Sequence, residues 1–218
     1  MAQVDSPAWT VVIPVKRTEI AKSRLAAAYP RHRQALARAF AVDTTAAALR
    51  TDGVAEVVVI TDDREVAEEV ADLGALVVPD EPDAGLNPAL DRAADLATRS
   101  GHGVAALSAD LPALRPDELA AVLRECAVRR SFVADAAGTG TTLLGAPDGG
   151  ALDPRFGRDS ATAHLVSGAA PVGLDDIDSV RRDVDTAADL AAATRLGVGP
   201  RTTAVLAVIE SGPEERLA

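Results

Sequence analysis

The hydrophobic positions of the chain alternate between two patterns. Short, nearly continuous apolar runs rich in β-branched residues are typical of strands that are buried on both faces. The stretches between them, such as Arg31–Arg50, repeat their apolar positions at helical spacing. This alternation predicts an α/β protein with a mostly parallel, mixed sheet flanked by helices. The first strands are expected at Trp9–Val15, Val54–Asp62, Ala75–Asp80 and Gly103–Asp110.

The alternation of strand and helix patterns changes after residue 130. Two apolar runs, "SFVAD" and "TTLLGA", follow each other with only "AAGTG" between them, which predicts a local antiparallel insertion on the sheet. A closing helix is predicted over Val184–Gly197, with Thr186 as its N-cap and Asp189 at the capping-box position. No repeat or linker marks a boundary. We therefore expect a single domain over residues 1–218, with a core of about 9–199 and a tail of 200–218.

Composition narrows the range of functions. The chain is 48% hydrophobic and 25% charged, so it can bury a full core. A net charge of −11 and an aromatic content of 2% argue against a nucleic-acid partner. The single Cys126 lies in a helical pattern and is interpreted as a packing residue. No signal peptide and no membrane span are recognised, so we expect a cytoplasmic protein without a membrane partner; a homo-oligomer is left open.

Two phosphate-binding motifs can be set aside. Lys22–Ser23 is preceded by Thr18–Ala21 and not by the glycines of a P-loop. The run "GTGTTL" has Leu143 where a dinucleotide-binding motif needs its third glycine. The three histidines, His32, His102 and His164, show no metal-ligand spacing and are interpreted as surface or capping residues.

Aspartates follow the fourth predicted strand and precede the closing helix. Asp110 ends "VAALSAD", at the strand end where α/β proteins bind ligands. It could hold Mg²⁺ or merely cap the turn that follows. Asp183 and Asp185 alternate, so in an extended segment they point the same way. Together with Asp110 they could form a Mg²⁺ site for a triphosphate, or they could simply favour the dipole of the next helix.

Two further segments could receive an anion. In Arg155–Leu165 a glycine, Asp159 and Ser160 precede a helical pattern, so free N–H groups and a hydroxyl could hold an anion, or one of these residues could be an ordinary N-cap. In Ala137–Thr142 small residues would let a ligand approach the backbone, or form a plain hairpin turn.

The first predicted strand is followed by three cations: Lys16, Lys22 and Arg24. The two lysines are the only ones in the chain, and every other basic residue is arginine. Lysine supplies a compact point charge that suits a triphosphate, so we interpret this segment as a phosphate-binding loop rather than a solvated basic loop.

The motifs "VVIPVK", "AKSRLA", "GLNPAL", "LSADLPAL", "GTGTTLL", "RFGRDSATAH" and "RDVDTAADL", in this order, resemble a known family. They are similar to the guanylyltransferases of coenzyme F-420 biosynthesis, which use phosphoenolpyruvate or 2-phospho-L-lactate. The resemblance covers the chain from about Trp9 to Gly199. It implies the nucleotidyltransferase fold, similar to that of nucleotide-diphospho-sugar transferases, with GTP as substrate and Mg²⁺ as cofactor.

The resemblance also implies roles for individual residues. Asp110 and either Asp183 or Asp185 would hold the metal. Lys16, Lys22 and Arg24 would bind the triphosphate and act in catalysis, and Asn87 would bind the base or cap its helix. Thr141, Gly157 and Ser160 would bind the phosphorylated acid.

The implied reaction joins phosphoenolpyruvate and GTP into enolpyruvyl-diphospho-guanosine and pyrophosphate. The acceptor phosphate is already ionised at neutral pH, so no general base is needed. The alternatives are a 2-phospho-L-lactate guanylyltransferase, a nucleotidyltransferase of the molybdenum-cofactor or sugar-phosphate type, and a non-catalytic acidic binding protein. Phosphoenolpyruvate is preferred because the "GTGTTLL" and "RFGRDS" segments resemble the bacterial branch.

The interpretation of the lysine segment predicts the effect of one substitution. Lys22→Ala should weaken the use of GTP much more than the binding of the acceptor, because Lys22 would contact the triphosphate and not the acceptor. Steady-state kinetics with each substrate varied in turn measures this. Equal losses for both substrates would contradict the assignment.

Overall fold

The computed structural model of the protein describes residues 8–16, 25–80, 85–98 and 100–212. Within these residues the chain forms one seven-stranded sheet. Its strands are β1 (Trp9–Pro14), β2 (Val54–Ile60), β3 (Leu76–Val78), β4 (Gly103–Leu107), β5 (Ser131–Ala134), β6 (Thr141–Ala146) and β7 (Ala170–Pro171).

The strand order across the sheet is β3-β2-β1-β4-β6-β5-β7. Strand β1 pairs in parallel with β2 and β4, β2 with β3, and β5 with β7. Strand β6 is antiparallel to both of its neighbours, β4 and β5. The predicted mostly parallel, mixed sheet is therefore confirmed. The antiparallel pair is also present, but β6 is inserted between β4 and β5 and forms part of the central sheet.

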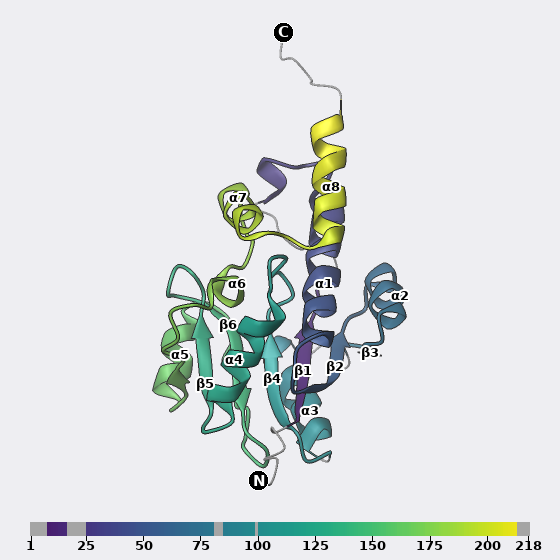
Figure 1. Ribbon diagram of the computed structural model, residues 1–218. Helices are drawn as coiled ribbons and strands as arrows, with labels where there is room; N and C mark the ends of the chain where they lie inside the picture. Colours follow the sequence, from purple (N-terminus) through teal and green to yellow (C-terminus); the bar gives the residue numbers. More distant parts are fainter. Residues whose placement is uncertain (1–7, 17–24, 81–84, 99, 213–218) are drawn as a thin grey trace, which may run out of the picture.

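Helices cover both faces of the sheet (Figure 1). They are η1 (Leu25–Ala27), α1 (Arg33–Leu49), α2 (Arg64–Asp72), α3 (Leu86–Thr98), α4 (Pro116–Cys126), α5 (Ser160–Val166), α6 (Asp178–Arg181), α7 (Ala187–Leu196) and α8 (Pro200–Ser211). The buried residues of α1, α2, α4 and α6 pack on one face, and those of α3 and α5 pack on the other. None of these helices is both long and apolar enough to cross a lipid bilayer.

The core contains few aromatic residues and relies on close packing of small ones. A Cβ atom at Gly145 would lie 2.7 Å from the sulfur of Cys126, and one at Gly103 would lie 2.9 Å from the Trp9 ring. Glycine therefore makes room at both positions for a larger neighbour. Cys126 is fully buried, and burial raises the pKa of its thiol to about 12. Its interpretation as a packing residue is confirmed.

Helix α8 lies beside α1 and extends beyond the sheet (Figure 1). The sequence pattern gave no assignment for this segment. Asp43 of α1 is buried, and its carboxylate accepts hydrogen bonds from the backbone N–H groups of Arg201 (3.0 Å) and Thr202 (2.8 Å). Gly199 packs directly against this carboxylate and leaves no room for a side chain. Asp43 thus caps a helix that is distant in sequence.

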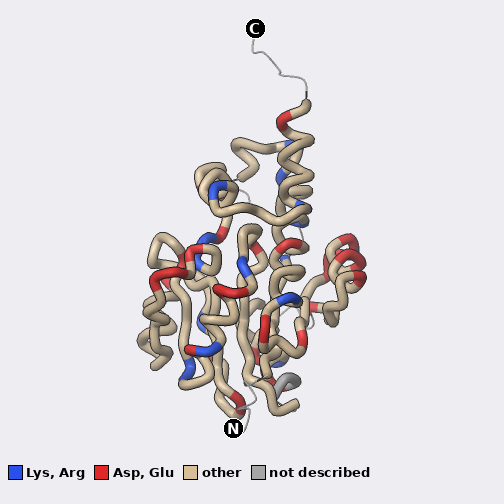
Figure 2. Tube along the Cα trace, viewed as in Figure 1, with Lys and Arg blue, Asp and Glu red and all other residues tan. Residues whose placement is uncertain are grey.

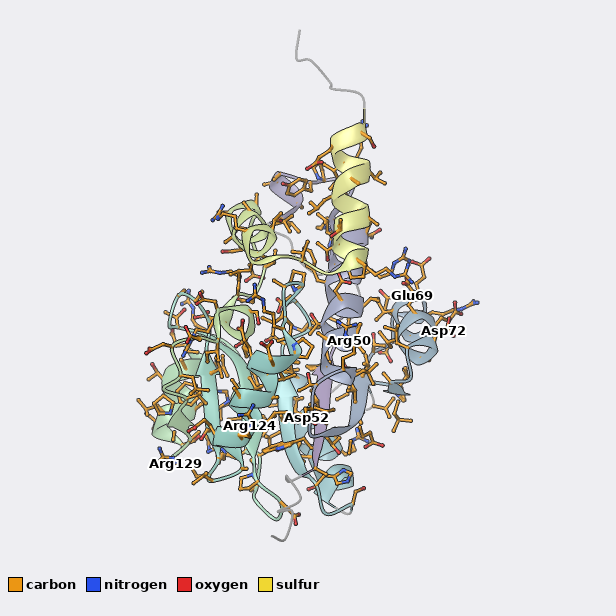
Figure 3. All side chains as sticks on the ribbon, in the orientation of Figure 1. Arg50, Asp52, Glu69, Asp72, Arg124 and Arg129 are labelled. Atoms are coloured by element: carbon orange, nitrogen blue, oxygen red, sulfur yellow. The ribbon has the colours of Figure 1, made fainter. Side chains whose placement is uncertain are left out.

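Acidic residues dominate the exposed helix α2, which carries Glu65, Glu68, Glu69 and Asp72 (Figure 2). Glu69, labelled in Figure 3, forms ion pairs with Arg38 of α1 (3.3 Å) and Arg201 of α8 (2.7 Å). Both arginines are partly exposed, so these pairs add little stability. The buried cap at Asp43 matters more for docking α8.

Asp43→Ala should destabilise the protein because it leaves the buried N–H of Thr202 and the partly buried N–H of Arg201 without acceptors. We expect a loss of about 1–3 kcal/mol of unfolding free energy. Urea unfolding monitored by circular dichroism measures this. Asp72→Ala, on the exposed end of α2, is the control and should change stability by no more than about 0.5 kcal/mol. Equal effects of the two substitutions would show that the cap contributes nothing.

Candidate active site

A pocket of about 320 Å³ opens at the carboxyl ends of β1 and β4. This is the edge at which open α/β sheets bind ligands. Most of its lining is apolar, and the polar side chains in the lining are a lysine, a serine and two aspartates. The pocket is lined by Pro14, Val15, Lys16, Ala37, Ala41, Leu86, Leu90, Ala106, Leu107, Ser108, Ala109, Asp110, Phe156 and Asp185.

Asp110 lies in the turn after β4, and helix α1 holds this turn in place. The Thr44 hydroxyl donates to the carbonyl oxygen of Ala109 (3.2 Å) and accepts from the backbone N–H of Leu111 (3.1 Å). Thr44 is fully buried. A buried side chain thus fixes the backbone on both sides of Asp110, and the aspartate lines the pocket.

The segment before α7 is joined directly to this turn. The backbone N–H of Val184 donates to the carbonyl oxygen of Asp110 (3.0 Å), and the Val184 side chain is fully buried. This brings Asp185 into the pocket beside Asp110. Asp183, its predicted alternative, is not among the residues that line the pocket. The predicted capping box is confirmed, because Thr186 caps α7 and Asp189 bonds back to its N–H (2.9 Å).

Of the three predicted cations, only Lys16 can be placed. It is exposed and lines the pocket just after β1. Lys22 and Arg24 lie outside the described residues. Among the described residues, no three His, Cys, Asp or Glu side chains gather in a way that could hold a metal ion. Any metal in this pocket would therefore have at most the two carboxylates, Asp110 and Asp185, from this part of the chain.

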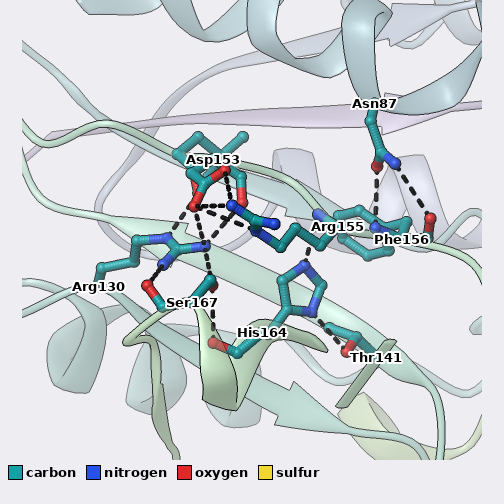
Figure 4. Close-up of polar contacts among 9 residues, drawn as sticks. Asn87, Arg130, Thr141, Asp153, Arg155, Phe156, His164 and Ser167 are labelled. Carbon is teal, nitrogen blue, oxygen red and sulfur yellow. Dashed lines mark hydrogen bonds and ion pairs between the residues drawn. The ribbon is translucent and has the colours of Figure 1, made fainter. Parts of the chain in front are cut away.

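Thr141, Gly157 and Ser160 come from segments that contact one another. Thr141 opens β6, and its hydroxyl lies 2.9 Å from Nδ1 of His164 in α5 (Figure 4). The backbone N–H of Ala161 in α5 donates to the carbonyl oxygen of Thr139 in the hairpin between β5 and β6 (3.1 Å). The two segments predicted to bind the acceptor substrate, Ala137–Thr142 and Arg155–Leu165, therefore pack against each other.

Local hydrogen bonds and backbone angles define the structure of each of these two segments. A hairpin turn, one of the two alternatives for Ala137–Thr142, is present: the Asp135 carboxylate accepts from the N–H of Thr139 (2.9 Å). Asp159 occupies the N-cap position of α5 with a φ of 55° and makes no side-chain cap bond. Ser160 is the first residue of the helix and is buried. Gly157 has a φ of 141°, which side chains rarely allow, and faces open space.

Asn87 joins helix α3 to the loop that precedes α5. Its Oδ1 accepts from the backbone N–H of Phe156 (2.9 Å), and its Nδ2 donates to the carbonyl oxygen of the same residue (3.1 Å). Phe156 itself lines the pocket. Both of these Asn87 side-chain bonds go to the loop at Phe156, and neither caps its own helix. Its contact with the base stays a prediction.

His164 was expected at the surface or at a cap, and that interpretation is wrong. The side chain is fully buried and its ring packs edge-on to Phe156, with centroids 5.0 Å apart. Burial lowers the pKa of His164 to about 4; the charges of Arg130 and Arg155 act in the same direction, and Asp153 opposes them. The helical spacing of Ser160, Ala161 and His164 could have revealed this inward face.

Arg130 is a second residue that the sequence did not reveal. It follows α4 and donates to the carbonyl oxygens of Leu152 (2.6 Å), Asp153 (2.7 Å) and Ser167 (3.2 Å) (Figure 4). Burial lowers the pKa of this guanidinium from its usual value. Arg130 thus ties the loop before Arg155 to the end of α5, and no local sequence pattern signals such long-range bonds.

The strand order and the position of the pocket define a nucleotidyltransferase fold. The structure matches that of 4-diphosphocytidyl-2C-methyl-D-erythritol synthase with a TM-score of 0.57 and 13% identity, over 88% of this chain and 99% of that one. It matches a nucleotidyl transferase from Methanothermobacter with a TM-score of 0.55 and 16% identity, over 88% and 98% of the two chains. At these identities the likeness establishes the fold alone.

The chain belongs to the family described as guanylyl transferase CofC like, whose model matches residues 9–209. It is 56% identical to a phosphoenolpyruvate guanylyltransferase from Salinispora arenicola, over 89% of this chain and 91% of that one. It is 54% identical to a phosphoenolpyruvate guanylyltransferase from Thermomonospora curvata, over 91% and 89% of the two chains. The family inferred from the sequence motifs is confirmed.

The buried His164 should make stability depend on pH. The folded-state pKa of His164 is about 4, below the unfolded value of 6.5. Its contribution to the free energy of unfolding is therefore fully present above pH 6.5 and is lost as the pH falls toward 4, because the unfolded chain binds the proton more readily. From pH 7.5 to pH 5 this amounts to about 2 kcal/mol. Urea unfolding at both pH values should show the wild type losing about that much more than His164→Gln. Parallel pH curves for the two proteins would contradict the prediction.

Proposed function

We propose that the protein is a guanylyltransferase that transfers GMP from GTP to phosphoenolpyruvate, with pyrophosphate as the second product, in coenzyme F-420 biosynthesis. The observation that carries the proposal is the meeting of Asp110, Asp185 and Lys16 in one pocket at the carboxyl edge of the sheet. Relatives more than 50% identical carry the name phosphoenolpyruvate guanylyltransferase. The proposal includes GTP as the donor, Mg²⁺ as the cofactor and the cytoplasm as the location.

The pocket suits one nucleotide. Its volume of about 320 Å³ falls at the lower end of the range usual for ligand sites. The apolar residues Leu86, Leu90 and Phe156 would contact the base and ribose, and the polar residues of the lining would contact the phosphates. Ala37 and Ala41 of α1 are small, which keeps this side of the pocket open.

The two aspartates fit a magnesium ion. Mg²⁺ is commonly held by one or two carboxylates together with the phosphate oxygens of a substrate, and it retains water molecules. Asp110 and Asp185 would hold it here, with Asp183 as the third candidate from the sequence. When bound, the ion supplies positive charge that offsets the charge of the triphosphate.

In the proposed reaction an oxygen of the acceptor phosphate attacks the α-phosphorus of GTP. A bond forms between that oxygen and the α-phosphorus, the bond from the α-phosphorus to the bridging oxygen breaks, and pyrophosphate leaves. The acceptor phosphate is ionised at neutral pH, so no side chain has to remove a proton. Lys16, Lys22 and Arg24 would bind the triphosphate and stabilise the departing pyrophosphate by their charge.

The acceptor would be bound by neutral groups. The hydroxyls of Thr141 and Ser160 can donate hydrogen bonds to a phosphate or a carboxylate. Gly157 has no side chain and faces open space, so an anion can approach its backbone. Phosphoenolpyruvate and 2-phospho-L-lactate share both charged groups. A competition assay that offers both acceptors with GTP would determine which one is preferred.

Asp110→Asn should lower turnover by at least about 10²-fold, because the amide cannot supply the charge that the metal needs. The fold should be retained, since the buried Thr44 hydroxyl holds the backbone on both sides of Asp110. Pyrophosphate release with GTP and phosphoenolpyruvate measures the turnover, and thermal unfolding checks the fold. Near-normal pyrophosphate release would refute the metal-binding role.

Asp185→Asn and Asp183→Asn form a matched pair beside this variant. The first should resemble Asp110→Asn, because Asp185 lines the pocket. The second should retain much more activity. Equal activity of the two variants would contradict the assignment of the metal-binding role to Asp185 rather than Asp183.

A further inference from the structure

The buried histidine of α5 determines which hydrogen bond its neighbour Thr141 can make. Nε2 of His164 lies 2.9 Å from the backbone nitrogen of Arg155, and a backbone N–H can only donate. Nε2 must therefore be the acceptor, so in the neutral ring the proton is on Nδ1. Turning the ring by 180° would place carbon atoms opposite both partners and lose both bonds.

The second ring nitrogen then fixes the role of the Thr141 hydroxyl. Nδ1–H faces Thr141 Oγ1 at 2.9 Å, so the hydroxyl oxygen accepts this bond. The hydroxyl still has its own proton to donate. Within the described part of the chain, Thr141 Oγ1 makes no second side-chain hydrogen bond. Its proton is thus left for an acceptor that is not part of this region of the protein.

An irregularity in the sheet turns Thr141 toward His164. Val133 pairs with Leu143 and Ala134 with Thr141, so β6 contains one extra residue, Thr142, at this point. Such a bulge changes the face to which the neighbouring side chain, here that of Thr141, points. Thr141 therefore shares a face with Ala134, which packs against the same cluster of buried residues as α5.

The histidine also holds the segment that borders the pocket. Through Arg155 it bonds to the backbone that leads into Phe156, and Asn87 holds Phe156 from the other side (Figure 4). His164 is thus bonded both to Thr141 and to the residue that precedes the pocket wall. A single buried ring fixes these two parts of the site relative to each other.

We propose that His164 is a positioning residue that fixes Thr141 as a hydrogen-bond donor to the anionic acceptor substrate. The proposal rests on the guanylyltransferase function proposed above. His164 itself does not touch the reacting atoms. A donor at Thr141 favours a phosphate or carboxylate oxygen, and it disfavours a ligand that presents a hydroxyl or amino hydrogen at the same place.

Two substitutions separate the two bonds of the ring. In His164→Gln the longer amide can still accept from Arg155 N–H, but nothing replaces the donor to Thr141. In His164→Asn the shorter amide can still donate to Thr141, but the acceptor for Arg155 is lost. We expect His164→Gln to raise the KM of phosphoenolpyruvate about tenfold, with the KM of GTP changed less than twofold. His164→Asn should raise the acceptor KM less than His164→Gln does.

A double-mutant cycle tests whether His164 acts through Thr141. Thr141→Val keeps the shape of the side chain and removes the hydroxyl, and it should raise the acceptor KM by about tenfold or more. Adding His164→Gln to Thr141→Val should then cause no further increase. Effects that multiply, or a fall in kcat with an unchanged acceptor KM, would overturn the proposal, because a merely structural role predicts those results.

A spectroscopic measurement tests the tautomer independently of activity. Long-range ¹H–¹⁵N correlation spectra at pH 7 distinguish a ring protonated at Nδ1 from one protonated at Nε2. The chain has three histidines, so comparison with His164→Gln assigns the signal. We expect the Nδ1-protonated form, and the Nε2-protonated form would overturn the proposal. An absence of pyrophosphate release by the wild type would instead refute the guanylyltransferase function and, with it, this role.

Discussion

The arrangement of the site depends on one backbone hydrogen bond, from the N–H of Val184 to the carbonyl oxygen of Asp110. It joins two acidic motifs that are far apart in the sequence. Thr44 holds the Asp110 side of this contact, and the buried Val184 side chain holds the other side. Val184 is fully buried, so its N–H has little access to water, and this favours the bond to Asp110. The carboxylates of Asp110 and Asp185 then line the same pocket.

The antiparallel strand β6 begins at the edge of the sheet where the parallel strands β1 and β4 end. Parallel strands bring their last residues to this edge, as β4 does with the turn that contains Asp110. Because β6 is antiparallel to β4, with Leu107 opposite Leu143, its first residue Thr141 lies beyond the end of β4. One reversed strand thus places a hydroxyl near the level of the aspartates without a further crossover helix. The mixed character of the sheet is therefore part of how the site is assembled.

Local features of the fold could be predicted from the sequence, and long-range polar contacts could not. The buried strands, the capping box at Thr186 and the packing role of Cys126 depend on periodicity or on residues close in sequence. Asp110 was found because a strand end is recognisable. By contrast, the cap that Asp43 provides for α8, the grip of Asn87 on Phe156 and the bonds of Arg130 join distant segments. Their partners become neighbours only after the chain has folded, so no sequence spacing indicates them. The burial of His164 is different, because the helical spacing of Ser160, Ala161 and His164 indicates it locally.

The neutral state of His164 has a consequence for an acidic protein that handles anions. A protonated ring would place an N–H donor opposite the N–H of Arg155, which is repulsive. Burial, aided by the charges of Arg130 and Arg155, lowers the pKa of His164 to about 4 and avoids this arrangement near neutral pH. The direction of the bond to Thr141 therefore stays the same over the range in which phosphate groups change their charge. In the proposed reaction, Thr141 would therefore remain a donor to the acceptor substrate throughout this range of pH.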